Sequence, residues 1–223
     1  MVTPDTWNRF VDDASPLPAD PDARVERRPS PAVGARVVTD TELPRLRGYR
    51  GDTRVVLSGG AGQVRGPAAY STQHGIEVVA LEVALRDLDD PAGNARRVVT
   101  AVDAALDEGV LVADPLVHVA MAGPPSYSWL AAADEVATAG LALALPLDRS
   151  LSPPDLAAWI DAAIDRELAF SLSGGTVAAA VAALTTTARL WGDEQDLVAA
   201  RRWCRSWTTA DVDAALDHLQ GLG

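Results

Sequence analysis

Two polar residues, Glu82 and His118, lie within otherwise apolar segments of the chain. A carboxylate and an imidazole are groups that often move protons in enzymes, so these two residues are candidate catalytic residues. A polar group inside an apolar strand also needs a partner, because leaving it unpaired in the core costs free energy. The alternative is a hydrogen-bonded core histidine, with Glu82 facing outward to meet a helix arginine such as Arg96 or Arg97.

The tripeptide Ser-Gly-Gly occurs twice, each time between a segment of β-formers and a helix-patterned segment. Glycines let backbone N–H groups approach an anion, and a helix N-terminus adds partial positive charge. The second copy, Ser173, Gly174 and Gly175, is the better candidate, because barrels often bind phosphate after their last strands. Arg86 is the candidate cation for the same anion. Tight turns and close packing also require glycine, which is the alternative for both copies.

A glycine-rich stretch, Gly60–Gly66, follows the segment of β-formers that ends at Ser58. In a dinucleotide-binding fold such a stretch holds the pyrophosphate, and Glu82 falls near the acidic position that binds the ribose. Pro67 interrupts the helix that this fold requires, and the residues up to His74 lack an apolar face. A dinucleotide-binding protein is therefore the less favoured alternative, and no cofactor is expected.

Arginine supplies all 19 basic residues, and the chain contains no lysine. A lysine-free protein cannot form a lysine Schiff base, bind PLP covalently or use the lysine of a nucleotide-binding P-loop. The formal net charge of −12 opposes binding to nucleic acid. The histidines His74, His118 and His218 are too dispersed to predict zinc. Asp12 and Asp13 more often cap a turn than hold a cation, so no metal is expected.

Short segments of β-formers alternate with helix-patterned segments, which is the pattern of parallel βα units. The predicted strands are Ala35–Thr39, Thr53–Ser58, Ile76–Leu85, Leu116–Met121, Leu141–Leu147 and Ala169–Ser173. We expect one α/β domain, with an irregular proline-rich arm at 1–34, βα repeats at 35–191 and further helices at 192–223. The predicted fold is a TIM-like (β/α) barrel, incomplete or with six to seven strands. A doubly wound sheet is the alternative, because periodicity does not distinguish the two.

Charged residues follow two of the predicted strands directly. Arg86 and Asp87 come after the strand at 76–85, and Asp148 and Arg149 come after the strand at 141–147. Parallel barrels carry their sites at the carboxyl ends of the strands, so position alone favours these residues for contact with a ligand.

Two further segments have apolar residues at the spacing of a buried helix face. A helix is predicted over Pro153–Leu168, with Ser152 as its N-cap and prolines in its first turn. Its predicted buried residues are Leu156, Trp159, Ile160 and Ala163. Near the C-terminus, Trp203 and Trp207 are one helical turn apart, which is the spacing of a packing stripe. We expect this Trp203/Trp207 face to pack on the core or on a second copy of the chain, which would make a homo-oligomer.

Several segments resemble an uncharacterised group of actinobacterial proteins. These segments are Trp7–Ala14, Val33–Leu46, Val55–Gly60, Glu77–Leu85 and Phe170–Gly175. The resemblance implies a (β/α)-barrel-like architecture and no particular activity. The chain departs from the pattern of the group after Ala14, where Ser15–Pro18 replaces an aromatic-proline-glycine run.

Two functions from different classes remain open at this point. The first is a small-molecule enzyme or binding protein for an anionic, phosphorylated metabolite at the strand carboxyl ends. The second is a non-catalytic scaffold or interaction subunit. The chain has no apolar run long enough to span a membrane, no visible signal peptide and a single cysteine, Cys204. A cytoplasmic protein is therefore expected.

Overall fold

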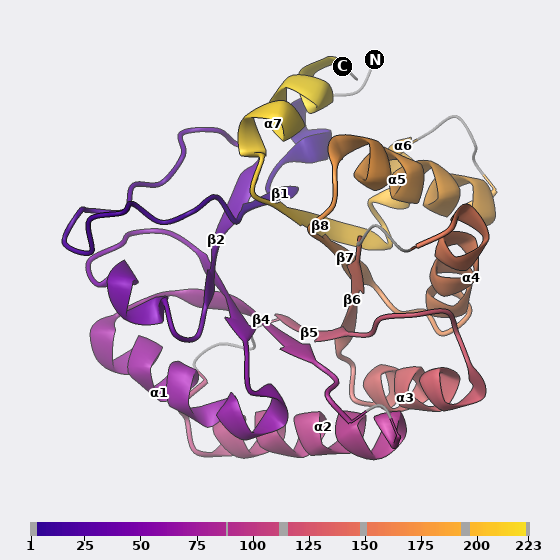
Figure 1. Cartoon of the computed structure of the whole chain (residues 1–223), viewed down its shortest axis with the longest axis horizontal. Coiled ribbons are helices and arrows are strands. Elements are labelled where there is room, and N and C mark those ends of the chain that lie inside the picture. Colours follow the sequence, from indigo (N-terminus) through magenta and orange to yellow (C-terminus); the bar gives the residue numbers. More distant parts are fainter. Residues whose placement is uncertain (1–3, 88, 112–115, 148–150, 193–196, 222–223) are drawn as a thin grey trace.

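The structure is a computed structural model that describes residues 4–87, 89–111, 116–147, 151–192 and 197–221. Eight parallel strands close into a barrel in the order of the sequence, with helices around the outside (Figure 1). The strands are β1 (Val11–Asp13), β2 (Val33–Thr39), β3 (Thr53–Leu57), β4 (Val78–Ala84), β5 (Leu116–Ala120), β6 (Ala142–Pro146), β7 (Phe170–Ser173) and β8 (Cys204–Thr209). The prediction of a TIM-like barrel is therefore confirmed, and the barrel is complete.

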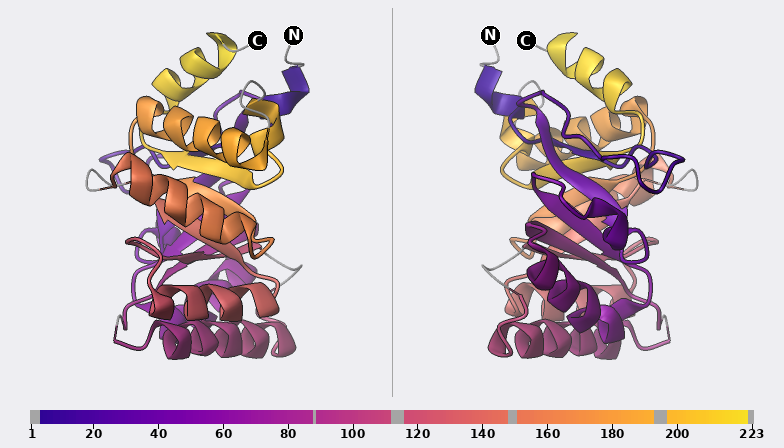
Figure 2. Two further views of the ribbon diagram at one scale, coloured as in Figure 1. Left: turned by 90° about the vertical axis from the view of Figure 1, so that its right-hand side faces the viewer. Right: turned by 90° about the vertical axis from the view of Figure 1, so that its left-hand side faces the viewer.

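The helices cover the barrel on all but one side. The α-helices are α1 (Arg65–His74), α2 (Pro91–Asp107), α3 (Tyr127–Thr138), α4 (Pro153–Ile164), α5 (Val177–Trp191), α6 (Leu197–Ala200) and α7 (Val212–Gly221); the short 3₁₀ helices are η1 (Pro4–Trp7), η2 (Leu43–Leu46) and η3 (Gly60–Gln63). An irregular segment, residues 14–32, connects β1 to β2, and the right-hand view of Figure 2 shows it in indigo on the side without α-helical cover. None of the described helices is long and apolar enough to cross a membrane.

The predicted number of six to seven strands is too low, because the six strands named from the sequence lack β1 and β8, the two that close the ring. Strand β1 pairs with both β2 and β8, and it lies inside the segment that was predicted to be an irregular arm. It is only three residues long and contains Asp12 and Asp13, so neither length nor β-propensity identifies it. Strand β8 lies in the segment that was predicted to be helical. Strands β1 and β8 were both missed, and both are stabilised mainly by pairing with neighbouring strands rather than by a local sequence pattern.

A bulge in β8 explains why its sequence looks helical. Phe170 of β7 pairs with Cys204 and Leu172 pairs with Trp207, so two residues of β7 oppose three of β8. The extra residue breaks the alternation of apolar and polar side chains that identifies a strand. Trp203 lies in the turn just before β8 and Trp207 lies within the strand, so their spacing of four is not a helical turn.

The two faces of the barrel wall differ in side-chain size. Apolar side chains of β3 to β7 that point to the helices are almost completely buried, among them Leu81, Val119 and Phe170. The inward face of β4, β5 and β6 instead carries small residues: Ala80, Ala84, Ala120, Ala142 and Ala144. Barrels of this class are usually filled by branched apolar side chains. The small residues here leave space in the centre for larger polar side chains.

Helix α4 begins as its sequence predicts and ends at Ile164, four residues before the predicted end at Leu168. The hydroxyl of Ser152 accepts a hydrogen bond from the backbone N–H of Asp155 at 3.3 Å, and Pro153 occupies the first turn. The predicted buried residues Leu156, Trp159, Ile160 and Ala163 are all buried. The indole of Trp159 donates to the carbonyl oxygen of Met121 at 2.9 Å, which ties α4 to the end of β5.

Candidate functional site in the barrel interior

Arg54 of β3 occupies the centre of the barrel and is fully buried. Its Nη2 atom donates to Glu82 Oε2 at 2.6 Å and to Ser171 Oγ at 2.8 Å. Its Nη1 atom donates to Asp12 Oδ2 at 3.2 Å and to Ser206 Oγ at 3.3 Å. These partners come from β4, β7, β1 and β8, so one arginine connects strands on opposite sides of the ring. We call this set of residues, with His118 and Ser173, the interior network.

Glu82 links the interior network to the carboxyl ends of the strands. Its two carboxylate oxygens accept from the hydroxyl of Ser173, at 2.9 Å and 3.0 Å. Glu82 is 7% exposed, Ser173 is partly exposed, and Ala84, the next inward-facing residue of β4, is exposed. The carboxylate therefore lies just below the mouth of the barrel.

The outward alternative for Glu82 is wrong. The arginines that it was expected to meet have partners on the outer surface. Arg96 pairs with Glu135 at 2.6 Å and Arg97 pairs with Asp87 at 2.9 Å.

His118 lies deeper and is 1% exposed. Its Nδ1 atom is 3.1 Å from Ser171 Oγ and 3.4 Å from the carbonyl oxygen of Leu143. Burial, and then the charge of Arg54, hold the pKa of His118 well below its usual value, so the ring is neutral at pH 7.

The two predicted catalytic residues, Glu82 and His118, are thus neighbours that lie at different depths in the barrel. Glu82 and His118 are cross-strand partners on the same face of β4 and β5. They are connected through Arg54 and Ser171, and Glu82 is the one that reaches the mouth. Asp12 adds a second buried carboxylate and also accepts from the backbone N–H of Ala35 at 3.0 Å. With a neutral histidine, two carboxylates against one guanidinium leave the interior network with one net negative charge.

The predicted anion-binding residues Gly174 and Gly175 are exposed at the start of α5. The backbone N–H of Gly174 is already used, because it donates to the carbonyl oxygen of Thr208 at 2.8 Å. The hydroxyl of Thr176 caps the helix by accepting from the backbone N–H of Ala179 at 3.3 Å. An anion here would therefore rely on the amide of Gly175 and on the remaining N–H groups of the first helical turn.

Packing alone also accounts for the glycine at position 175. Gly175 has a φ of +74°, and a Cβ atom there would lie 2.5 Å from the Cβ atom of Leu147. Either reason, the backbone conformation or the contact, excludes a larger residue. The alternative that these glycines serve a tight turn is thereby supported as strongly as the anion site.

Arg86 lies on the opposite part of the rim and is exposed. Its backbone N–H donates to Asn94 Oδ1 at 2.9 Å, and its aliphatic carbons lie over Gly60, with Cδ 3.5 Å from the position of a Cβ there. The side chain is therefore placed at the mouth, next to the turn after β3. The charged pair Asp148 and Arg149 lies outside the described residues.

A pocket of about 350 Å³ adjoins the interior network at the ends of β4, β5 and β6. Its lining includes the inward-facing Ala84, Ala120 and Pro146 and, from helix α3 and the loop before it, Trp129 and Ser126. Along β4 and β5, Ala84 and Ala120 stand two residues beyond Glu82 and His118, which is one step up the same face. The pocket thus opens the mouth towards α3.

The tryptophans near the C-terminus do not form an exposed Trp203/Trp207 face. Trp203 is 6% exposed and Trp207 is 2% exposed, and the indole of Trp207 donates to the carbonyl oxygen of Gly174 at 2.9 Å. The accessible indole is that of Trp191, which is 42% exposed and lies 5.2 Å from Trp203, centroid to centroid. The guanidinium of Arg202 stacks 4.8 Å from the centroid of the Trp191 ring.

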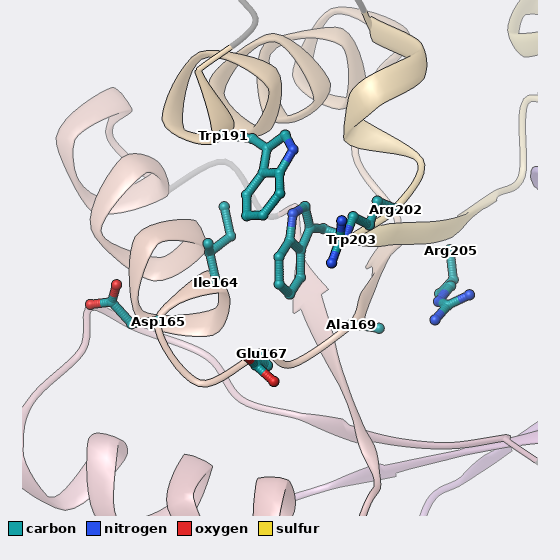
Figure 3. Close-up of a pocket in the computed structure, with 8 residues that line it drawn as sticks. All are labelled: Ile164, Asp165, Glu167, Ala169, Trp191, Arg202, Trp203 and Arg205. Atoms are coloured by element: carbon teal, nitrogen blue, oxygen red, sulfur yellow. The ribbon is translucent and has the colours of Figure 1, made fainter.

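Figure 3 shows Trp191, Trp203 and Arg202 around a second pocket, of about 380 Å³. The lining of this pocket also includes Ile164, at the end of α4, and Glu167, from the segment between α4 and β7. The pocket lies at the amino ends of the strands. This end of a barrel usually serves stability rather than chemistry. A homo-oligomer through this region stays a prediction.

The dinucleotide-binding alternative fails on the fold. A closed ring in sequence order has no reversal of strand order, and such a reversal forms the crevice in which a dinucleotide binds. Pro67 does not interrupt the following helix, because it stands in the first turn of α1, where proline is tolerated. Among the described residues, no group of three or more His, Cys, Asp or Glu side chains is placed to hold a metal ion.

Arg54, Asp12, Ser171 and Ser206 were not among the predicted site residues. Arg54 stands between β-formers in the same way as Glu82 and His118, so the same criterion would have identified it. Ser171 is a small residue whose sequence context is unremarkable for a strand, and Ser206 lies in the segment that was predicted to be helical.

Comparison with known proteins identifies no family. No family model matches the chain, and no curated protein matches it. Of what the resemblance to actinobacterial proteins implies, only the barrel architecture is confirmed.

Proposed function

We propose that the protein binds a small metabolite that carries an anionic group, at the mouth formed by the carboxyl ends of the barrel strands. The observation that supports this most is the hydrogen-bonded pair of Glu82 and Ser173 below the mouth. Arg54 fixes the carboxylate from beneath, and the chain continues from Ser173 directly into the exposed Gly174 and Gly175. A fixed carboxylate thus stands beside an exposed helix N-terminus.

The distribution of charge at the mouth indicates two groups that the ligand should carry and where each of them binds. The net negative charge of the interior network repels an anion from the centre of the barrel, so the anionic group belongs at the rim. There the N–H groups of Gly175 and the first turn of α5 offer partial positive charge, and Arg86 offers a full charge from the β4 side. Glu82 then accepts a hydrogen bond from a hydroxyl or amino group of the same ligand. A phosphorylated alcohol or amine has both features.

If the protein is an enzyme, proton transfer belongs to Glu82. It is the ionisable member of the interior network that lies just below the mouth, whereas His118 is 1% exposed and neutral. His118 acts as a positioning residue, because its Nδ1 atom contacts the hydroxyl of Ser171, which in turn accepts from Arg54.

A second candidate, a non-catalytic scaffold, is favoured by one observation. The guanidinium of Arg54 is paired within the barrel with both carboxylates, Asp12 and Glu82, which is also what a purely structural core requires. The two functions differ in whether Glu82 and Ser173 contact anything besides the protein.

Thermal shift and calorimetry with inorganic phosphate and a panel of small phosphate monoesters test the proposal. We expect at least one monoester to raise Tm, and Ser173→Ala to weaken its binding at least tenfold while the variant stays folded. Arg65→Gln is the control, because the exposed side chain of Arg65 pairs with Glu108, at the C-terminal end of α2. Binding that Ser173→Ala leaves unchanged, or the absence of binding by any compound of the panel, would favour the scaffold.

A further inference from the structure

A groove outside the barrel concentrates positive charge on an otherwise acidic protein. It has a volume of about 630 Å³ and lies between residues 21–25 of the irregular segment and residues 44–50 of the β2–β3 connection. Its lining includes Arg24, Arg45, Arg47 and Arg50, and one acidic residue, Asp22. Four positive charges and one negative charge leave three net positive charges here, whereas the whole chain carries −12.

The groove arginines carry charge that no ion pair among the described residues neutralises. Some exposed arginines elsewhere do form ion pairs, such as Arg65 with Glu108 at 2.6 Å and Arg97 with Asp87 at 2.9 Å, whereas others, such as Arg86, form none with the described residues. Within the part of the chain that the structure describes, none of the four groove arginines forms an ion pair. Their charge is therefore available to a ligand.

Two of the guanidinium groups are held in place. Arg47 donates from Nε to the hydroxyl of Tyr70 at 2.8 Å, and its guanidinium carbon lies 5.8 Å from the centre of that ring. Arg45 donates from Nη2 to the carbonyl oxygens of Pro18 and Asp20 in the irregular segment. A guanidinium has five N–H groups, so each still has donors to offer. Side chains that are already ordered lose less entropy when a ligand binds.

We infer that this groove binds a small polyanion with two or more phosphate groups. Guanidinium groups bind phosphate oxygens through paired, charge-assisted hydrogen bonds, and several ordered arginines match a multiply charged anion better than a single carboxylate. The volume lies within the usual range for small-molecule sites. None of the groove residues belongs to the mouth of the barrel, so this site is separate from the one proposed above.

Isothermal titration of the full chain with inorganic triphosphate tests the inference. We expect saturable binding with one triphosphate per chain, weakened at least tenfold by the double variant Arg47→Gln/Arg50→Gln. The control Arg65→Gln/Arg96→Gln also removes two positive charges, but from exposed positions outside the groove. We expect this control to change the affinity for triphosphate less than twofold. Raising the salt concentration should weaken binding of the parent more steeply than that of the groove variant.

Three results would overturn the inference. They are no binding of triphosphate by the parent chain, equal losses in the groove variant and the control, and a tenfold loss in Arg86→Gln with none in the groove variant. The last result would place the triphosphate at the barrel mouth and would support the proposed function instead. Circular dichroism of each variant verifies that the fold is retained, and Arg50→Gln alone, at an exposed position, replaces the double variant if that one unfolds.

Discussion

Arg54 shows how one residue can define the interior of a barrel. A guanidinium that is fully buried requires partners around it, and here it has two carboxylates and two hydroxyls from four strands. Removing one member of a buried ion pair usually costs more than the pair contributes, because a charge is left without compensation. Replacing any one charged residue of the interior network should therefore destabilise the fold, regardless of which ligand the protein binds.

The neutral His118 makes the stability of the protein depend on pH. Burial, and then the charge of Arg54, lower its pKa in the folded state, whereas in the unfolded chain it titrates near its ordinary value of 6.5. Below that value the unfolded state binds a proton that the folded state does not, so the free energy of unfolding decreases as the pH falls. The slope from this one residue approaches about 1.4 kcal/mol per pH unit between the two pKa values.

Denaturant unfolding between pH 7.5 and pH 5 measures this slope. His118→Asn keeps a polar group near the position of Nδ1 but does not titrate, so its stability should change less over this range than that of the parent. The control is His74→Asn, since His74 lies on the surface at the end of α1. An equal pH dependence in the parent and in His118→Asn would contradict the assignment of a buried neutral ring.

At the residue scale, the sequence predicts which side chains are unusual but not what they contact. Glu82 and His118 stand out because a polar residue interrupts an apolar strand. Their connection through Arg54 and Ser171 depends on the tilt and register of strands far apart in the chain, which no local pattern contains. Gly175 stands out as well, but the close approach of Leu147 that requires glycine comes from another βα unit.

At the scale of elements, strands with apolar sequences and helices with clear caps are predicted well. Strands β3 to β7 and helix α4 each carry enough local apolar pattern to be recognised. Strand β1 is too short for this, and the bulge in β8 replaces the alternation of a strand with a spacing that is typical of a helix. Both strands are stabilised mainly by pairing within the closed ring, which is a property of the tertiary structure.

Helix α4 offers a direct test of local stabilisation. The hydroxyl of Ser152 both accepts from the backbone N–H of Asp155 and donates to its carboxylate, at 3.3 Å and 2.6 Å. We expect Ser152→Ala to lower the free energy of unfolding by about 1 kcal/mol, which corresponds to about 2–4 °C in Tm for a chain of this size. Ser152→Gly should cost only a few tenths of that energy, because glycine is tolerated at the N-cap. Equal melting temperatures for the parent and Ser152→Ala would show that the cap contributes nothing.

At the scale of the whole molecule, the ends of the chain close the barrel. Strand β1 near the N-terminus pairs with β8 near the C-terminus, through Val11 with Trp207 and Asp13 with Thr209. The C-terminal segment also supplies Ser206 to the interior network and buries Trp203, Trp207 and Leu219. We therefore expect the two termini to belong to one cooperative unit, and neither to behave as an appendage.

Deleting residues 192–223 tests this unity most directly. The deletion removes β8 and α7 and leaves both β1 and β7 as open edges, which promotes aggregation. Replacing one buried tryptophan by alanine already costs about 3–5 kcal/mol, compared with a typical total stability of about 5–15 kcal/mol. We therefore expect insoluble protein, or protein that lacks near-ultraviolet circular dichroism and a cooperative melt. A shorter deletion, residues 211–223, retains β8 and removes only α7, so it should stay folded with a lower Tm. If the long deletion is instead soluble and melts within a few degrees of the full chain, the C-terminal segment is independent of the barrel and the single-domain prediction is wrong.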